Sequence, residues 1–400
     1  MAHRNDRLDV PHIAIILRRL AKFLIFPIII YLLFIPWSDS IALGQDYSKD
    51  WLIAKFNTLD NAINHGEGYG NDTNEFAVLA WGESYILQAY LDMYQATKNK
   101  KYIEKFISQA KKVYQNTDSA RNIKDYKGKK RSGWSATKYS KHQEPVVHIV
   151  HTGMVLYPLV KFSLMVKQDA TLATYKDWAD KFTELGEKAA REIDDQWGYN
   201  ASTGEGSYRF VGDEPLKFSV KGQMPFNGQL AFGRVLIALY KITGKESYLS
   251  KARALATMFK RHLVTTPQGA YVWGYAPSTK ITLMEDISHG GIDVDFAVEA
   301  AQANIVFNRT DLERFAKTIL NAKKNNKFVE FVDGSGDDPK DIYSSSSGPW
   351  LELSAVNCRV YGAVAGFLLD RVKQRTRETP QGLLGLAKLT KYFDQCHAKQ

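Results

Sequence analysis

Apolar residues recur at spacings of three and four along most of the chain beyond position 50, which is the periodicity of amphipathic helices. The pattern predicts a leading helix over 50–64 and then helix pairs, with short turns between partners such as 243–245. The predicted pairs are 74–98 with 100–114, 146–166 with 170–193, 226–242 with 246–263, 289–307 with 311–324, and 354–375 with 380–397.

The first helix of each pair is the more apolar one, as the contrast between 230–239 and the lysine-rich 251–260 illustrates. An inner ring of buried helices and an outer ring of solvated ones would produce this difference. We therefore predict an all-α fold, an (α/α) toroid of five to six helix pairs.

Two stretches repeat each other 146 positions apart, as expected of a helical array. Gly82-Glu83 leads into Tyr94, Thr97, Tyr102 and Ala110, as Gly228-Gln229 leads into Tyr240, Thr243, Tyr248 and Ala256. The repeat predicts that Trp81 and Glu83 lie at the same end of the fold as Asn227 and Gln229. The helix starts at His151 and His289 resemble each other and would join them at one mouth.

Long connections lead into the inner helices, over 116–145, 194–225, 264–288 and 325–353. Long loops in a compact domain are usually functional, so we expect them to form a cleft at that mouth. The aromatic residues of this region that we expect to bind a ligand are Trp81, Trp134, Trp273 and Trp350.

The first 45 residues differ from the rest of the chain. Arg18, Arg19 and Lys22 precede an apolar run over 23–37, and small residues follow at 42–44. This is typical of an export signal or of an uncleaved membrane anchor, and both place residues 46–400, a single predicted domain, in the periplasm or outside the cell. Cys358 falls in an apolar helical pattern and is expected to be a small buried residue.

The net charge of +10 is concentrated in a basic run over 121–141. Such a run could attract an acidic polysaccharide or a membrane surface. No nucleic-acid-binding motif accompanies it, so nucleic acid is not an expected partner. His148 and His151 have the spacing of a metal pair but no third ligand can be named, and we predict neither a metal nor a cofactor.

The helix pairs, the aromatic loops and the segment EDISHGGIDVDF over 285–296 resemble the six-hairpin (α/α)-toroid carbohydrate-active enzymes. That group includes glycoside hydrolases, polysaccharide lyases and the C-terminal domain of glucuronyl C5-epimerases. The resemblance implies a polysaccharide substrate. Asp293, Asp295 and Glu299 make this inner helix unusually acidic, which is expected of a working site because buried acids are costly unless paired.

His289 is the expected acid or base, because it precedes two glycines and follows Glu285 and Asp286, which could orient its ring. The resemblance to toroidal lyases implies that Asn227 contacts a uronate carboxylate and that a tyrosine, Tyr208 or Tyr275, transfers a second proton. The preferred prediction is therefore proton chemistry at C5 of a uronic acid, by a lyase or an epimerase. Further substrate contacts are expected from His148, His151, Arg209 and Gln229.

Two alternatives remain open. Glu83 could form an acid–base pair with Asp286 or Glu285 in an inverting glycoside hydrolase, which needs two carboxylates with room for water between them. The chain could also be a non-catalytic glycan-binding protein of the cell envelope.

Overall fold

A computed structural model describes residues 47–217, 224–278, 280–373 and 379–398. All of them belong to one compact unit, residues 43–400. The predicted export signal or anchor in residues 1–45 lies outside the described residues.

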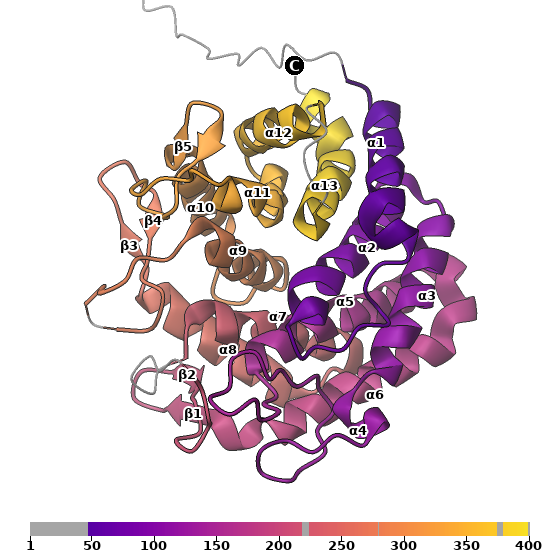
Figure 1. The fold of residues 1–400 in the computed structure, drawn as a ribbon. Coiled ribbons are helices and arrows are strands. Elements are labelled where there is room, and N and C mark those ends of the chain that lie inside the picture. The colour runs from indigo at the N-terminus through magenta and orange to yellow at the C-terminus, as the bar shows by residue number, and fades with distance from the viewer. Residues whose placement is uncertain (1–46, 218–223, 279, 374–378, 399–400) are drawn as a thin grey trace, which may run out of the picture. The chain divides into compact units, whose positions relative to one another are not determined.

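In the described part of the chain, six elements form an inner ring in which each packs against the next (Figure 1). In order they are α2 (Ser84–Thr97), α5 (Ile149–Gln168), α7 (Phe226–Thr243), α9 (Ile287–Gln302), the 3-10 segment η5 (Gly348–Ala355) and α13 (Pro380–His397). The first eleven residues of α2 and the first fourteen of α7 are all buried. A helix that is buried on every side has to be apolar on every side, which explains their composition.

Six outer helices cover this ring, again counted over the described residues, and each packs on one or two inner elements. They are α3 (Lys101–Gln115), α6 (Lys176–Glu192), α8 (Glu246–Arg261), α10 (Arg309–Asn321), α12 (Cys358–Lys373) and α1 (Lys49–Ala62). These helices carry polar residues toward solvent and apolar ones toward the ring. The predicted (α/α) toroid is confirmed, with six pairs.

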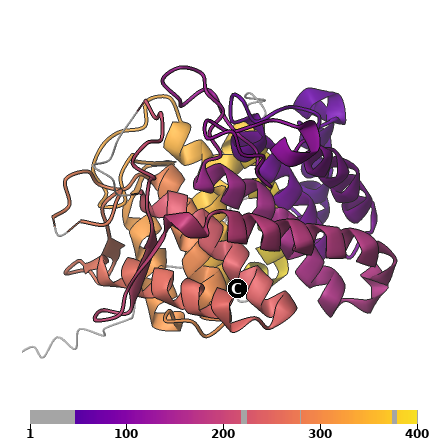
Figure 2. The ribbon, with the colours of Figure 1, turned by 90° about the horizontal axis from the view of Figure 1, so that it is seen from below.

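In the last predicted pair, 354–375 with 380–397, the assignment of the inner and the outer helix is wrong. α12 is an outer helix, whereas α13 lies in the inner ring beside α2, with α1 outside it. The first and last described helices therefore lie side by side, as the indigo and yellow ribbons show in Figures 1 and 2. Lys388 and Lys391 make α13 look solvated in sequence, but both side chains are largely buried against acids.

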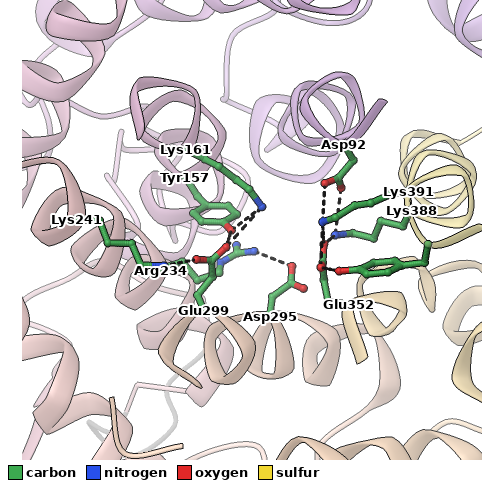
Figure 3. Close-up of polar contacts among 11 residues, drawn as sticks. Asp92, Tyr157, Lys161, Arg234, Lys241, Asp295, Glu299, Glu352, Lys388 and Lys391 are labelled. Carbon is green, nitrogen blue, oxygen red and sulfur yellow. Dashed lines mark hydrogen bonds and ion pairs between the residues drawn. The ribbon is translucent and has the colours of Figure 1, made fainter. Parts of the chain in front are cut away.

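A buried network of charges fills the middle of the ring, with members from every inner element (Figure 3). Its members are Asp92, Tyr157, Lys161, Arg234, Lys241, Asp295, Glu299, Glu352, Lys388, Lys391 and Tyr392. Asp295 pairs with Arg234 at 3.1 Å, and Glu299 pairs with lysines of α5 and α7. Asp295 and Glu299 therefore join α9 to the neighbouring helices of the ring, where each buried carboxylate has a cation as its partner.

Cys358 and Cys396 form a disulfide between α12 and α13. Cys358 is half-buried and disulfide-bonded, so the expectation of a small buried residue is wrong. The two cysteines are 38 positions apart and come together only because two helices fold back on each other, which spacing alone does not reveal.

The connections hold the remaining short elements. Two are short helices, α4 (Asp118–Arg121) and α11 (Ile342–Ser345), and four are 3-10 or π segments, η1 (Ile63–Gly66), η2 (Leu79–Glu83), η3 (Ala170–Tyr175) and η4 (Asp194–Gln196). Three are hairpins, in which β1 (Trp197–Asn200) pairs with β2 (Glu205–Tyr208), β3 (Val264–Thr265) with β4 (Tyr271–Val272), and β5 (Lys323–Lys324) with β6 (Lys327–Phe328).

Within the described residues, α5 alone is long and apolar enough to cross a membrane, and 83% of its most apolar window is buried by the rest of the fold. This helix is accordingly a core element of the ring.

Candidate active site

A cavity of about 310 Å³ opens where α5, α7 and α9 begin. Its walls include six residues predicted from the sequence, namely Trp81, His148, His151, Asn227, Tyr275 and His289. The remaining wall residues are Tyr139, Ile149, Val150, Gln196, Phe210, Glu214, Met224, Pro225 and Gly228. The chain therefore brings one group from each of several inner helix starts to one hollow.

His289 is held by Asp286, which caps the N-terminus of α9. One carboxylate oxygen of Asp286 accepts hydrogen bonds from the backbone N–H groups of Ser288 and His289, and the other lies 2.6 Å from His289 Nδ1. Because Asp286 is an acceptor, Nδ1 carries the proton and Nε2 is the nitrogen left for a ligand. The His289 side chain is 35% exposed and lines the cavity next to Tyr275, at 5.7 Å between ring centres.

The charges of this pair are mutually stabilising. Burial disfavours the imidazolium, but the hydrogen bond and charge of Asp286 outweigh it and raise the pKa of His289. Burial likewise opposes ionisation of Asp286, yet the His289 ring and two backbone N–H groups lower the pKa of this carboxyl. The arrangement is that of an acid–base histidine oriented by a carboxylate.

Two further carboxyls, those of Glu285 and Asp293, lie behind the dyad that His289 forms with Asp286. Glu285 and Asp293 are fully buried and hydrogen-bonded to each other, which requires that one of them carries a proton. Burial and the charge of Asp293 raise the pKa of Glu285 well above its usual range, so Glu285 is the donor. Asp293 also accepts from Trp273 Nε1 at 2.9 Å, and burial raises its pKa to about 7.

His148 and His151 line the cavity from the start of α5. Asn74 settles the tautomer of His151: its Oδ1 accepts from the backbone of Ala80, so its Nδ2 is the group that donates to His151 Nδ1 at 3.1 Å. His151 is therefore neutral with its proton on Nε2. Burial lowers the pKa of His148 to about 4 and that of His151 well below its usual value, which is consistent with neutral rings.

Asn227 lies in the first turn of α7, and Pro225 occupies the N-cap position. Its Oδ1 is buried and has no hydrogen-bond partner among the described residues. The N-termini of α5 and α7 also have no side-chain cap. Two helix ends without a side-chain cap, each with a partial positive charge, thus open onto the cavity, which favours an anionic group there.

Glu83 does not line the cavity. Its Oε2 accepts from the backbone N–H of Tyr69 at 2.6 Å, and burial raises the pKa of this carboxyl to about 8. Gln229, the equivalent residue of the repeat, is buried too and accepts from the backbone of Tyr208. The hydrolase alternative requires Glu83 to share the cavity with Asp286 or Glu285, and none of these three carboxyls is among the residues that line it.

Other predicted ligand-binding residues also lie away from the cavity. Trp134, Trp273 and Trp350 are buried, and their indole N–H groups donate to Val113, Asp293 and Ile287. Tyr208 is buried against Trp197 and Phe232. Arg209 is exposed and its guanidinium covers Gly198. Tryptophans fill cores as readily as they stack on ligands, so residue type alone does not separate the two.

Sequence reasoning missed Glu214, Tyr139, Phe210 and Gln196 as cavity residues. All lie in the long connections 116–145 and 194–225, so the length of these loops was the available signal. Glu214 is the most informative, since burial raises the pKa of its carboxyl to about 7. A carboxyl that is still partly protonated at neutral pH can serve as a general acid.

Within the described residues, Glu285, Asp286 and His289 are the set of three potential metal ligands whose atoms lie within 4.8 Å of one another. The closeness is explained by the bond from His289 Nδ1 to Asp286, which uses the nitrogen that such a metal would need. The prediction that the site holds no metal stays a prediction.

No protein-family model matches the chain, and no curated protein does. Solved structures do match. An α-1,6-mannanase from a Salegentibacter species is 12% identical, with 87% of this chain and 100% of that chain covered and a TM-score of 0.52. An unsaturated glucuronyl hydrolase specific for heparin is 12% identical over 88% and 99%, with a TM-score of 0.54.

A third match is the cellobiose 2-epimerase of Spirochaeta thermophila, 12% identical over 79% of this chain and 86% of that chain, with a TM-score of 0.51. Identities this low establish a shared fold. The predicted resemblance to six-hairpin toroid carbohydrate-active enzymes is thereby confirmed for the architecture.

Proposed function

We propose that this protein is a carbohydrate-active enzyme that removes a proton from a ring carbon of an acidic sugar, by β-elimination or epimerisation. The observation that carries the proposal is the dyad of His289 and Asp286 at 2.6 Å, on a cavity that also holds the neutral His151. A histidine with one nitrogen fixed and the other facing a cavity is suited to proton transfer.

In the proposed reaction, His289 Nε2 takes the proton from the carbon next to the sugar carboxylate. The C–H electron pair passes into the carboxylate, and Asp286 stabilises the imidazolium that forms. Return of a proton to the opposite face of the carbon gives the epimer. Departure of the oxygen substituent on the adjacent carbon, with protonation of that oxygen, gives the unsaturated product. Tyr275, beside His289, is the candidate for the second proton transfer.

The carboxylate of the substrate is proposed to lie against the starts of α5 and α7. Their uncapped N–H groups, the Nε2–H of His151 and the amide of Asn227 would stabilise the negative charge that grows there. Lys138 of the basic run lies close enough to His151 to lower its pKa further. A structural neighbour that acts on a glucuronyl substrate supports the same class of sugar.

A glycoside hydrolase is the second candidate. It is favoured by Glu214, whose pKa of about 7 would allow it to protonate a leaving oxygen, and by the mannanase among the structural neighbours. In this case His289 with Asp286 would activate the attacking water.

One experiment separates these functions. The full chain is incubated in D₂O with polygalacturonate, alginate, heparin or α-1,6-mannan, and the products are examined by NMR, ultraviolet absorbance and reducing-end assay. An unsaturated uronate, or deuterium at C5 without new ends, is the expected result, and His289→Asn should abolish it. New reducing ends without unsaturation, lost in Glu214→Gln, would instead establish the hydrolase. Binding without any product would favour a non-catalytic glycan-binding protein.

Export of the domain remains part of the proposal. The disulfide between Cys358 and Cys396 supports it, because disulfides persist in oxidising compartments such as the bacterial periplasm. Fusion of residues 1–45 to a reporter that is active only in the periplasm tests it, with a deletion of 23–37 as the control. If the reporter fused to the intact segment 1–45 were inactive, export would be contradicted.

A further inference from the structure

The outer face of the toroid carries a second concavity, of about 650 Å³, between the β1/β2 hairpin and α8. Figure 1 shows the two strands beside this outer helix. The groove shares no wall residue with the candidate active site. The two are nevertheless neighbours along the chain, because Gln196 faces the cavity and the next residue, Trp197, faces the groove.

One wall of the groove is aromatic. Trp197 and Tyr199 are two positions apart on β1 and therefore point to the same side of the hairpin. The Tyr199 side chain is 60% exposed, which is unusual for a large ring with no covering segment. The indole of Trp197 lies across Gly206, where a Cβ atom would come within 2.4 Å of the ring. Glycine at this position therefore lets the indole lie flat against the hairpin.

The facing wall is polar and carries an unpaired cation. Ser247 and Ser250 are exposed on one face of α8 and line the groove. Arg253, also exposed there, has no ion pair or hydrogen bond among the described residues. Lys251 differs from it, since it is paired with Asp194. A free guanidinium is a bidentate partner for a carboxylate or a sulfate.

We infer that this groove binds a strand of acidic glycan, separately from the cavity where the reaction takes place. A pyranose ring presents an apolar face of C–H groups that packs on an aromatic plane, while its hydroxyls need hydrogen-bonding partners at its edge. Tyr199 and Trp197 supply the plane, the two serines supply the partners, and Arg253 meets the acidic group. The acidic character of the glycan rests on the proposed function.

Such a groove would keep a polymer attached while its end is processed in the cavity. A second binding site linked to the first through one molecule raises the local concentration of substrate without any new contact at the reacting sugar. Polymers should benefit from the groove, whereas oligosaccharides too short to reach it should not.

The test is affinity electrophoresis of the full chain carrying His289→Asn, which measures binding without turnover, in gels containing polygalacturonate, alginate, heparin or uncharged dextran. We expect at least one acidic polymer to retard the protein and dextran to have no effect. Tyr199→Ala and Arg253→Ala should each weaken that binding about fivefold. Phe76→Ala, which removes another exposed ring, and Arg309→Ala, which removes the same charge from α10, are the matched controls.

Retardation that is unchanged in Tyr199→Ala, or equally reduced by Arg309→Ala, would overturn the inference. So would loss of turnover of a short oligosaccharide in an otherwise unmodified Tyr199→Ala protein, because the groove would then belong to the catalytic site. Failure of the proposed function would leave binding by the His289→Asn protein intact, so the two outcomes are distinguishable.

Discussion

Glu83 and Gln229 occupy equivalent positions of the internal repeat and make the same contact. Each accepts a hydrogen bond from the backbone N–H of a tyrosine in the preceding connection, Tyr69 at 2.6 Å and Tyr208 at 2.9 Å. A carboxyl in one copy and an amide in the other serve one architectural purpose, which is to fix the loop that leads into an inner helix.

Replacement of Glu83 by glutamine should therefore preserve the fold and change its response to pH. The pKa of Glu83 is about 8 when folded and about 4.5 ordinarily, so the folded protein holds a proton that the unfolded chain has lost between these values. Its contribution to stability falls as pH rises through that window. Glu83→Gln should be more stable than the parent at pH 8 by up to about 4 kcal/mol, and no more stable at pH 4, in urea denaturation. Equal pH slopes for both proteins would contradict this.

Asp286→Asn tests the dyad. The variant keeps an acceptor for the N-terminus of α9 but loses the charge that raises the pKa of His289. Turnover should fall by about 10²- to 10⁴-fold. Since a general base must be deprotonated, kcat/KM should rise with pH through a pKa above 6.5 in the parent and through a lower one in the variant. A pH profile with an unmoved midpoint would count against His289 as the base.

Glu285 offers a contrast between two substitutions. Because Glu285 is the protonated member of its pair with Asp293, Glu285→Gln retains a neutral donor and should change the free energy of unfolding by less than about 1 kcal/mol. Glu285→Ala leaves the Asp286 N–H and the Asp293 carboxyl without this partner and should cost about 1–3 kcal/mol. Chemical denaturation at pH 6 measures both, and equal losses would contradict the shared proton.

The disulfide should stabilise the joint between the last two helices. It closes a loop of 38 residues, for which restriction of the unfolded chain predicts about 4 kcal/mol. Paired replacement of Cys358 and Cys396 by serine should lower the unfolding free energy by up to this amount. Addition of a reductant should then affect the parent and not the double variant, and an effect on both would point to another cause.

The sequence predicted the ring because its evidence is local. Helical periodicity and glycine-containing turns are visible in short windows, so α5, α7 and α9 lie within a few residues of their predicted limits. The sequence could also predict that His148, His151 and Asn227 lie together at the cavity, because the starts of the inner helices lie at one end of a toroid.

What the sequence did not reveal depends on long-range packing. Trp134, Trp273 and Trp350 look like ligand platforms until the fold places each indole N–H on a buried acceptor. Glu214 looks like an ordinary loop acid, since only the tertiary fold buries it enough to raise its pKa. Whether α13 is an inner or an outer helix depends on Asp92, which lies 299 positions before Lys391.

The closure of the ring by α13 has a consequence for how the chain is made. Lys388 and Lys391 bind Asp92 of α2, so the first inner helix gains its last neighbour from a helix almost 300 positions further along the chain. Until α13 has been synthesised, α2 has an uncovered apolar side and Asp92 lacks its two lysine partners. The ring can close only once α13 has left the ribosome, and a nascent chain whose ring is still open exposes apolar surface that chaperones can bind.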